Sequence, residues 1–115
     1  MTDATLYTTQ GKSETVPLNR LGLHFEFREY ANSIDHIAVI LDCSPSLVDI
    51  LATGDVYVAF SIFDYEGAVN IEAMRALAQL TGYRFDTLDE DQILRGPILL
   101  IQQNQVPLVE TRTSS

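Results

Sequence analysis

The sequence has one cysteine, no tryptophan and no long apolar run, and each shortage excludes a class of protein. Cys43 cannot form an intramolecular disulfide, so the chain is no disulfide scaffold and a reducing compartment fits it best. The longest apolar run, Val56 to Ile62, falls far short of the roughly 20 residues of a membrane-spanning helix. Residues 1–10 lack the basic and apolar regions of a secretory signal. We therefore expect a soluble protein in the cytoplasm of its own cell or of a host.

Basic residues are also scarce. Seven Lys and Arg residues stand against 16 Asp and Glu residues, which gives a formal net charge of −9. A field of this sign repels phosphate backbones and anionic lipid headgroups. Nucleic acid and membrane surfaces are therefore poor candidate partners, and we expect no direct contact with either.

The residue patterns that usually carry catalysis are missing as well. The two histidines, His24 and His36, have no partner at metal-ligand spacing, and no serine lies in a G-x-S-x-G turn. The six glycines are too dispersed for a phosphate-binding loop. We predict that the protein is not an enzyme and that it needs no cofactor and no metal.

The 115 residues, 46% of them hydrophobic, predict a single domain over 1–115 that folds without a disulfide or metal. Hydrophobic periodicity and capping residues place strands at 21–28, 56–63 and 98–101, and helices from Asn32 or Ser33 to Asp42, from Ser44 to Gly54 and from Asn70 to Gly82. A capping box at 87–90 predicts a further short helix. Residues 1–15 are expected to be largely loop or an edge strand, and 110–115 a frayed tail. The fold class predicted is α+β, with a mixed or antiparallel sheet of about four to five strands and three to four short helices.

Two of the predicted strands, Val56 to Phe63 and Ile98 to Ile101, are apolar on both faces. Strands of this kind lie in the middle of a sheet that is covered on both sides. Only one predicted helix, Asn70 to Gly82, is long and clearly amphipathic, so a second copy of the chain is a candidate for the remaining cover. A homodimer is therefore a possibility, with Tyr57 or Phe63 in its interface.

Residues 34–51 (IDHIAVILDCSPSLVDIL) resemble a helix-turn-helix. The resemblance rests on Ala38, Leu41, Ser44, Val48 and Leu51. It implies two packed helices and, as an alternative function, a transcriptional regulator. The second helix would present no Arg, Lys, Asn or Gln to DNA, which disfavours base reading.

The most informative feature is where the charge lies. Between Glu29 and Met74 there are eight acidic residues and no Lys or Arg, whereas the rest of the chain has 8 acids and 7 bases. Such segregation either steers basic partners or keeps an apolar chain soluble. Tyrosines lie among these acids, and aromatic residues ringed by charge are typical binding anchors. We predict that a basic protein, such as a nucleic-acid-binding protein, is bound by Glu29, Asp35, Asp42, Asp49, Asp55, Asp64, Tyr65 and Glu66. A structural or assembly subunit is a further alternative.

Overall fold

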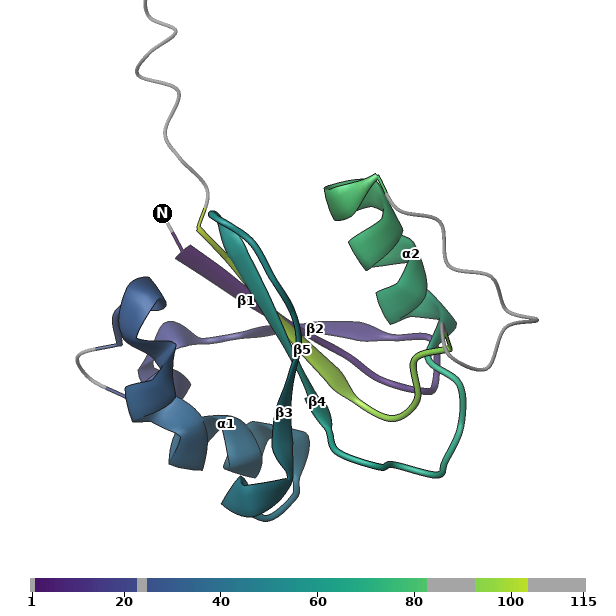
Figure 1. Cartoon of the computed structure of the whole chain (residues 1–115), viewed down its shortest axis with the longest axis horizontal. Helices are drawn as coiled ribbons and strands as arrows, with labels where there is room; N and C mark the ends of the chain where they lie inside the picture. Colours follow the sequence, from purple (N-terminus) through teal and green to yellow (C-terminus); the bar gives the residue numbers. More distant parts are fainter. Residues whose placement is uncertain (1, 23–24, 83–92, 104–115) are drawn as a thin grey trace, which may run out of the picture.

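A five-stranded antiparallel sheet runs through the protein in the order β2-β1-β5-β4-β3 (Figure 1). The computed structural model describes residues 2–22, 25–82 and 93–103. Its strands are β1 (Thr2–Tyr7), β2 (Ser13–Val16), β3 (Val48–Thr53), β4 (Tyr57–Ile62) and β5 (Ile98–Gln103). Among the described residues there are two α-helices, α1 (Ile34–Leu41) and α2 (Ile71–Thr81), and 3-10 helices at Leu18–Leu21, Phe27–Ser33 and Pro45–Leu47.

The sheet is covered on both faces, by α1 on one side and α2 on the other (Figure 1). Side chains of β4 and β5 alternate between two cores: Val58 and Phe60 pack with α1, whereas Ala59 packs with α2. In β5, Leu99 and Leu100 divide in the same way. The prediction that these two apolar stretches form interior strands is confirmed. An antiparallel sheet with helices on its faces is an α+β arrangement.

Both confirmed helices begin and end where their capping residues indicate. The side chain of Asn70 accepts a hydrogen bond from the Ala73 amide, and Gly82 ends α2 in the left-handed region at φ 75°. Helix α1 ends at Asp42, which is itself left-handed at φ 63°. The helices thus have the predicted bounds to within one or two residues.

The strand predicted at 21–28 is wrong for the residues described there. Leu21 ends one 3-10 helix and Phe27 begins another, and both side chains are buried in the core on the α1 side. Gly22, at φ 109°, turns the chain out of an extended path. The Ser33 hydroxyl donates to the Leu21 carbonyl at 2.8 Å and fixes the loop against the start of α1. The alternating polarity here belongs to a loop in which these two apolar side chains are buried.

The helix predicted from Ser44 to Gly54 is also wrong. Only Pro45–Leu47 forms a 3-10 helix, and the next six residues are strand β3, which pairs with β4. Val48, Ile50 and Thr53 are β-branched, and pairing with an apolar neighbour strand outweighs the weak helical signal. The helix-turn-helix resemblance therefore has no second helix in the structure.

The amino-terminal region differs from the prediction in a third way. Residues 2–7 form β1 inside the sheet between β2 and β5, and of these two amino-terminal strands β2 is the one at an edge. The described residues hold two α-helices where three to four short helices were predicted; the capping box at 87–90 and the tail at 110–115 lie outside them. Neither described helix has the length and apolarity needed to cross a membrane.

Candidate functional site

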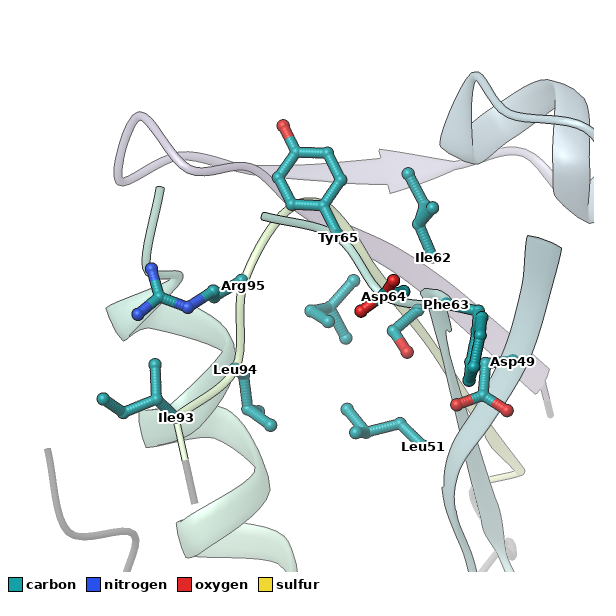
Figure 2. Close-up of a pocket in the computed structure, with 11 residues that line it drawn as sticks. Asp49, Leu51, Ile62, Phe63, Asp64, Tyr65, Ile93, Leu94 and Arg95 are labelled. Atoms are coloured by element: carbon teal, nitrogen blue, oxygen red, sulfur yellow. The ribbon is translucent and has the colours of Figure 1, made fainter. Parts of the chain in front are cut away.

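A cleft of about 340 Å³ opens on the α2 side of the sheet, where β3 begins and β4 ends (Figure 2). One side of it, which we call the strand wall, consists of Asp49 and Leu51 from β3 and of Phe63 and Asp64 after β4. The opposite side, which we call the braced wall, is the segment 93–96. Tyr65 lies between the two walls.

The strand wall follows from the pairing of β3 with β4. Asp49 is opposite Ser61 in the antiparallel register, so their side chains share the α2 side of the sheet with the cleft. The Phe63 amide donates to the Leu47 carbonyl at 2.7 Å, which extends the pairing by one residue beyond β4. The Phe63 side chain is nevertheless 61% exposed. The backbone of this wall is therefore held by strand pairing, whereas its Phe63 side chain is exposed to solvent.

The braced wall is held by backbone contacts with the loop before α2. The Gly96 amide donates to the Ala68 carbonyl at 3.0 Å, and the Asn70 amide donates to the Leu94 carbonyl at 2.8 Å. Arg95 forms an isolated bridge with Val69, and its guanidinium donates to the Gly67 carbonyl at 2.9 Å. Residues 67–70 and 94–96 are thus joined along their length.

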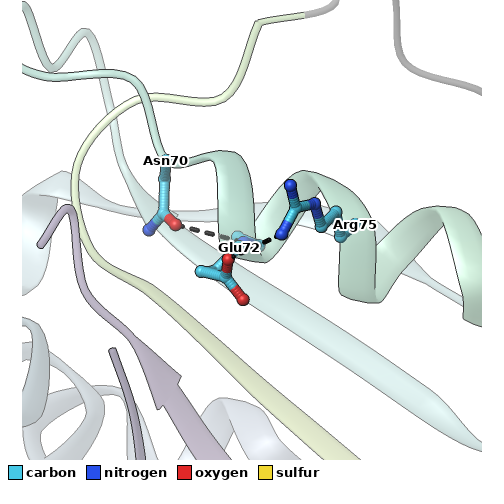
Figure 3. Close-up of polar contacts among 4 residues, drawn as sticks. Asn70, Glu72 and Arg75 are labelled. Atoms are coloured by element: carbon cyan, nitrogen blue, oxygen red, sulfur yellow. Dashed lines mark hydrogen bonds and ion pairs between the residues drawn. The ribbon is translucent and has the colours of Figure 1, made fainter. Parts of the chain in front are cut away.

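Asn70 is the centre of this bracing, and Figure 3 shows its hydrogen bond at the start of α2. Its side chain is 1% exposed, and its amide nitrogen donates to the carbonyls of Tyr7 and Gly96 at 2.9 and 2.7 Å. Its oxygen accepts from Ala73 at 3.1 Å. One side chain therefore joins β1, the start of α2 and the braced wall, with both amide hydrogens and its oxygen satisfied.

The position of Tyr65 depends on two glycines. Its ring lies over Gly67 and Gly96, and a Cβ added at Gly96 would lie 2.7 Å from Tyr65 Cδ1. Gly96 also has φ 78°, which disfavours any other residue. Tyr65 is 38% exposed and so presents part of its ring to the cleft.

Acidic groups outnumber basic ones at the site: Asp49 and Asp64 line the cleft, and Arg95 is the one Lys or Arg residue among the described lining residues. Glu72 pairs with Arg75 on α2 at 3.1 Å (Figure 3), but the other seven acids of the 29–74 segment form no ion pair among the described residues. Two of the seven, Asp42 and Asp64, occupy the left-handed region at φ 63° and 57°. These are the non-glycine residues with positive φ in the described part of the chain. Aspartate and asparagine adopt this conformation more readily than other non-glycine residues, so both positions accept an aspartate.

The structure gathers some of the predicted partner-binding residues and separates others. Asp49, Asp64 and Tyr65 line the cleft, and exposed Glu66 follows directly. Asp42 ends α1, whose carboxyl end lies at the same end of the sheet as the start of β3 (Figure 1). The others lie elsewhere: Glu29 and Asp35 are exposed on the α1 layer, and Asp55 is in the turn at the far end of β3.

Sequence reasoning missed the braced wall and did not place Phe63 among the partner-binding residues. Arg95 is 31 positions from Asp64 in the printed sequence, and no local pattern joins them. A usable signal for Phe63 is that it ends an apolar strand and directly precedes the Asp64-Tyr65-Glu66-Gly67 turn.

Among the described residues, the Cys43 thiol and the Tyr7 hydroxyl have shifted acidity, and neither lines the cleft. Partial burial, with a smaller effect from neighbouring Asp42, raises the pKa of the Cys43 thiol. Burial, and then the charge of Glu72, raises the pKa of Tyr7. A thiol shifted in this direction is a weak nucleophile at neutral pH. Across the described ranges, no three His, Cys, Asp or Glu side chains cluster in a way that could hold a metal ion.

No family model, curated protein or solved structure matches the chain.

Proposed function

We propose that the protein is a stoichiometric, non-enzymatic binding module that recognises a basic surface of a partner protein in the cytoplasm of its own cell or of a host. Inhibitors, antitoxins, immunity proteins and viral counter-defence proteins act in this way. A nucleic-acid-binding protein is a natural partner because its surface is basic. The proposal includes no cofactor, metal, membrane or direct nucleic-acid contact.

The strand wall is the observation that supports this proposal. Asp49 and Asp64 are exposed carboxylates on either side of Phe63, whose ring is open to solvent. A lysine or arginine side chain entering the cleft could bond a carboxylate and lie over an aromatic ring. A cation over an aromatic ring contributes about 0.5–1 kcal/mol at exposed sites, and charge-assisted hydrogen bonds are stronger than neutral ones.

The segregated charge would act before contact. The segment from Glu29 to Met74 has eight acids and no Lys or Arg, so its field points a basic partner towards this part of the molecule. Fields of this kind raise association rates more than they lower dissociation rates, and salt screens them. The two effects, steering and capture in the cleft, can therefore be separated kinetically.

The test is comparative capture from the native host with immobilised protein. The double variant Asp49→Asn/Asp64→Asn removes the charges of the cleft, and Asp55→Asn, at the far end of β3, is the matched control. We expect a basic protein to be retained by the wild type and by Asp55→Asn and to be lost from the double variant. Retention by all three proteins would contradict the proposed use of the cleft.

A further inference from the structure

We infer that the partner contributes an extended basic segment that pairs with β3 and becomes a sixth strand of the sheet. This inference rests on the proposed function and names the form in which the basic partner binds. Adding a strand to an open sheet edge is a recurring mode of peptide recognition, in which the backbone supplies affinity and alternate side chains supply specificity.

No described strand pairs with β3 on the side away from β4. Strand β3 lies at the end of the strand order, and β4 is its one neighbour among the described residues. The Phe63 amide donates to the Leu47 carbonyl at one end of the β3–β4 pairing, and the Gly54 amide donates to the Tyr57 carbonyl at the other. In an antiparallel pair, residues whose backbone groups bond the neighbouring strand alternate with residues whose backbone groups point away from it. Val48 and Ile50 are one and three residues beyond Leu47, so their carbonyls and the Ile50 amide point outwards from the sheet, whereas the Val48 amide donates to the Pro45 carbonyl.

The other edge of the sheet provides an internal comparison. Strand β2 has four residues, its first three side chains are polar and exposed, and Pro17 follows it directly. Short length, polar side chains and proline are the usual protections of an edge strand. Strand β3 has six residues and no lysine or proline, and Ile50 is 46% exposed on it. Its one protection is the register shift between Ile50 and Ala52, which leaves residues 47–50 as the accessible stretch.

The negative charge of this edge favours a basic strand over a second copy of the chain. Two β3 strands paired with each other would bring two chains of charge −9 together, each with Asp49 on the shared edge. A basic strand has the complementary charge. Because Asp49 faces the cleft, alternate side chains of an added strand would project beside Asp49 and Phe63, where Lys or Arg fits. Side chains at the intervening positions would lie beside Ile50 and would be apolar.

The experiment uses a synthetic eight-residue peptide in which arginine and valine alternate. Fluorescence anisotropy gives its affinity, and hydrogen exchange reports the outward-facing amide of Ile50. We expect binding, at least tenfold slower exchange at this amide, and at least tenfold weaker binding after N-methylation of the alternate residues whose amides face β3. N-methylation of the other set should change affinity less than threefold.

Two edge variants complete the test. Ile50→Lys places a cation on the open edge at a half-exposed position and should weaken peptide binding at least tenfold. Thr15→Lys places the same cation on β2, where Thr15 is exposed, and should have no effect.

The outcomes separate the two proposals. If Asp49→Asn/Asp64→Asn weakens peptide binding while both N-methylated sets bind like the parent, the basic cleft stands and strand addition is wrong. If the peptide does not bind although the cleft-dependent partner is captured, strand addition is again wrong. Protection of the Ile50 amide without peptide, in a species of twice 12.8 kDa by ultracentrifugation, would show that a second copy occupies the edge.

Discussion

The two walls of the cleft are built on opposite plans. In the braced wall, Gly96, Leu94 and Arg95 all have hydrogen-bond partners in the loop before α2, and Asn70 is almost completely buried behind them. In the strand wall, Phe63 and Asp49 are exposed, and no described strand pairs with the outer edge of β3.

This difference suggests that one wall maintains the shape of the cleft and the other binds a partner. A wall whose polar groups are satisfied holds its shape without a ligand, whereas an open wall with exposed aromatic and acidic groups leaves binding capacity unused. We expect substitutions in the braced wall to act on stability and substitutions in the strand wall to act on binding.

Asn70→Ala tests the braced wall most severely. The change removes the cap of α2 and leaves the carbonyls of Tyr7 and Gly96 without their donor. A buried polar group left unsatisfied costs about 1–3 kcal/mol, and loss of a cap about 1 kcal/mol, so we expect the free energy of unfolding to fall by roughly 2–4 kcal/mol. Urea denaturation measures this. A loss below about 1 kcal/mol would show that the wall is not braced through Asn70.

Gly96→Ala should have the next largest effect. A methyl group at this position meets the Tyr65 ring, and the backbone has positive φ. We expect a loss of roughly 1–3 kcal/mol. Gly82→Ala is the matched control, because Gly82 has a similar φ of 75° with open space around it, and it should lose only about 1 kcal/mol. Equal losses would mean that contact with Tyr65 is unimportant.

Asp42→Gly should stabilise the protein. It relieves a left-handed conformation at the end of α1 and removes a negative charge from a helix carboxyl terminus. We expect a gain of about 1 kcal/mol, and a smaller gain for Asp42→Asn. Thermal unfolding measures both. If glycine destabilises the protein, the Asp42 carboxylate has a structural contact that favours the native turn.

Phe63→Ser should leave stability within about 0.5 kcal/mol, because most of the side chain is already exposed. The same change should weaken binding of the basic peptide at least tenfold. This combination distinguishes the strand wall from the braced wall most directly. A large loss of stability would place Phe63 in the core and remove the contrast between the walls.

The smallest effect concerns pH. The raised pKa of the Cys43 thiol means that the folded state holds this proton more tightly than the unfolded state does. Its contribution to stability is complete below about pH 8.5 and is lost as pH rises through the folded pKa. Cys43→Ala should therefore flatten the decline of stability in alkaline urea titrations, relative to the wild type. Tyr7 acts in the same direction at higher pH, so some decline will persist in the variant.

The sequence predicted those parts of the fold whose signals are local. Asn70 and Gly82 enclose α2, and apolar runs, interrupted by Ser61 in β4, mark β4 and β5. Strand β3 was missed because Ser44-Pro45 begins a helix by local rules, whereas the pairing with β4 that decides the outcome is tertiary.

The residues of the site also divide into those that local sequence signals predict and those that only the fold brings together. Charge segregation identified Asp49 and Asp64, and the neighbouring aromatic identified Tyr65. The braced wall approaches them only through the fold, because Arg95 comes from beyond α2 and its bond to Gly67 spans 28 residues. Sequence alone therefore pointed to an acidic surface and could not show that part of it is a cleft.

The place of β5 in the sheet has a consequence for synthesis and folding. This strand is the last one described along the chain, yet it lies between β1 and β4 and joins two hairpins that otherwise do not touch in the sheet. Until it emerges from the ribosome, β1 and β4 each have an unpaired side, and the apolar residues of β4 lack their neighbours. Contacts between residues this far apart in the sequence slow folding, and they prolong the exposure of unpaired, aggregation-prone strand edges. A nascent chain that stops before Ile98 should consequently depend on chaperones or aggregate, whereas release of the full chain completes the sheet in one step.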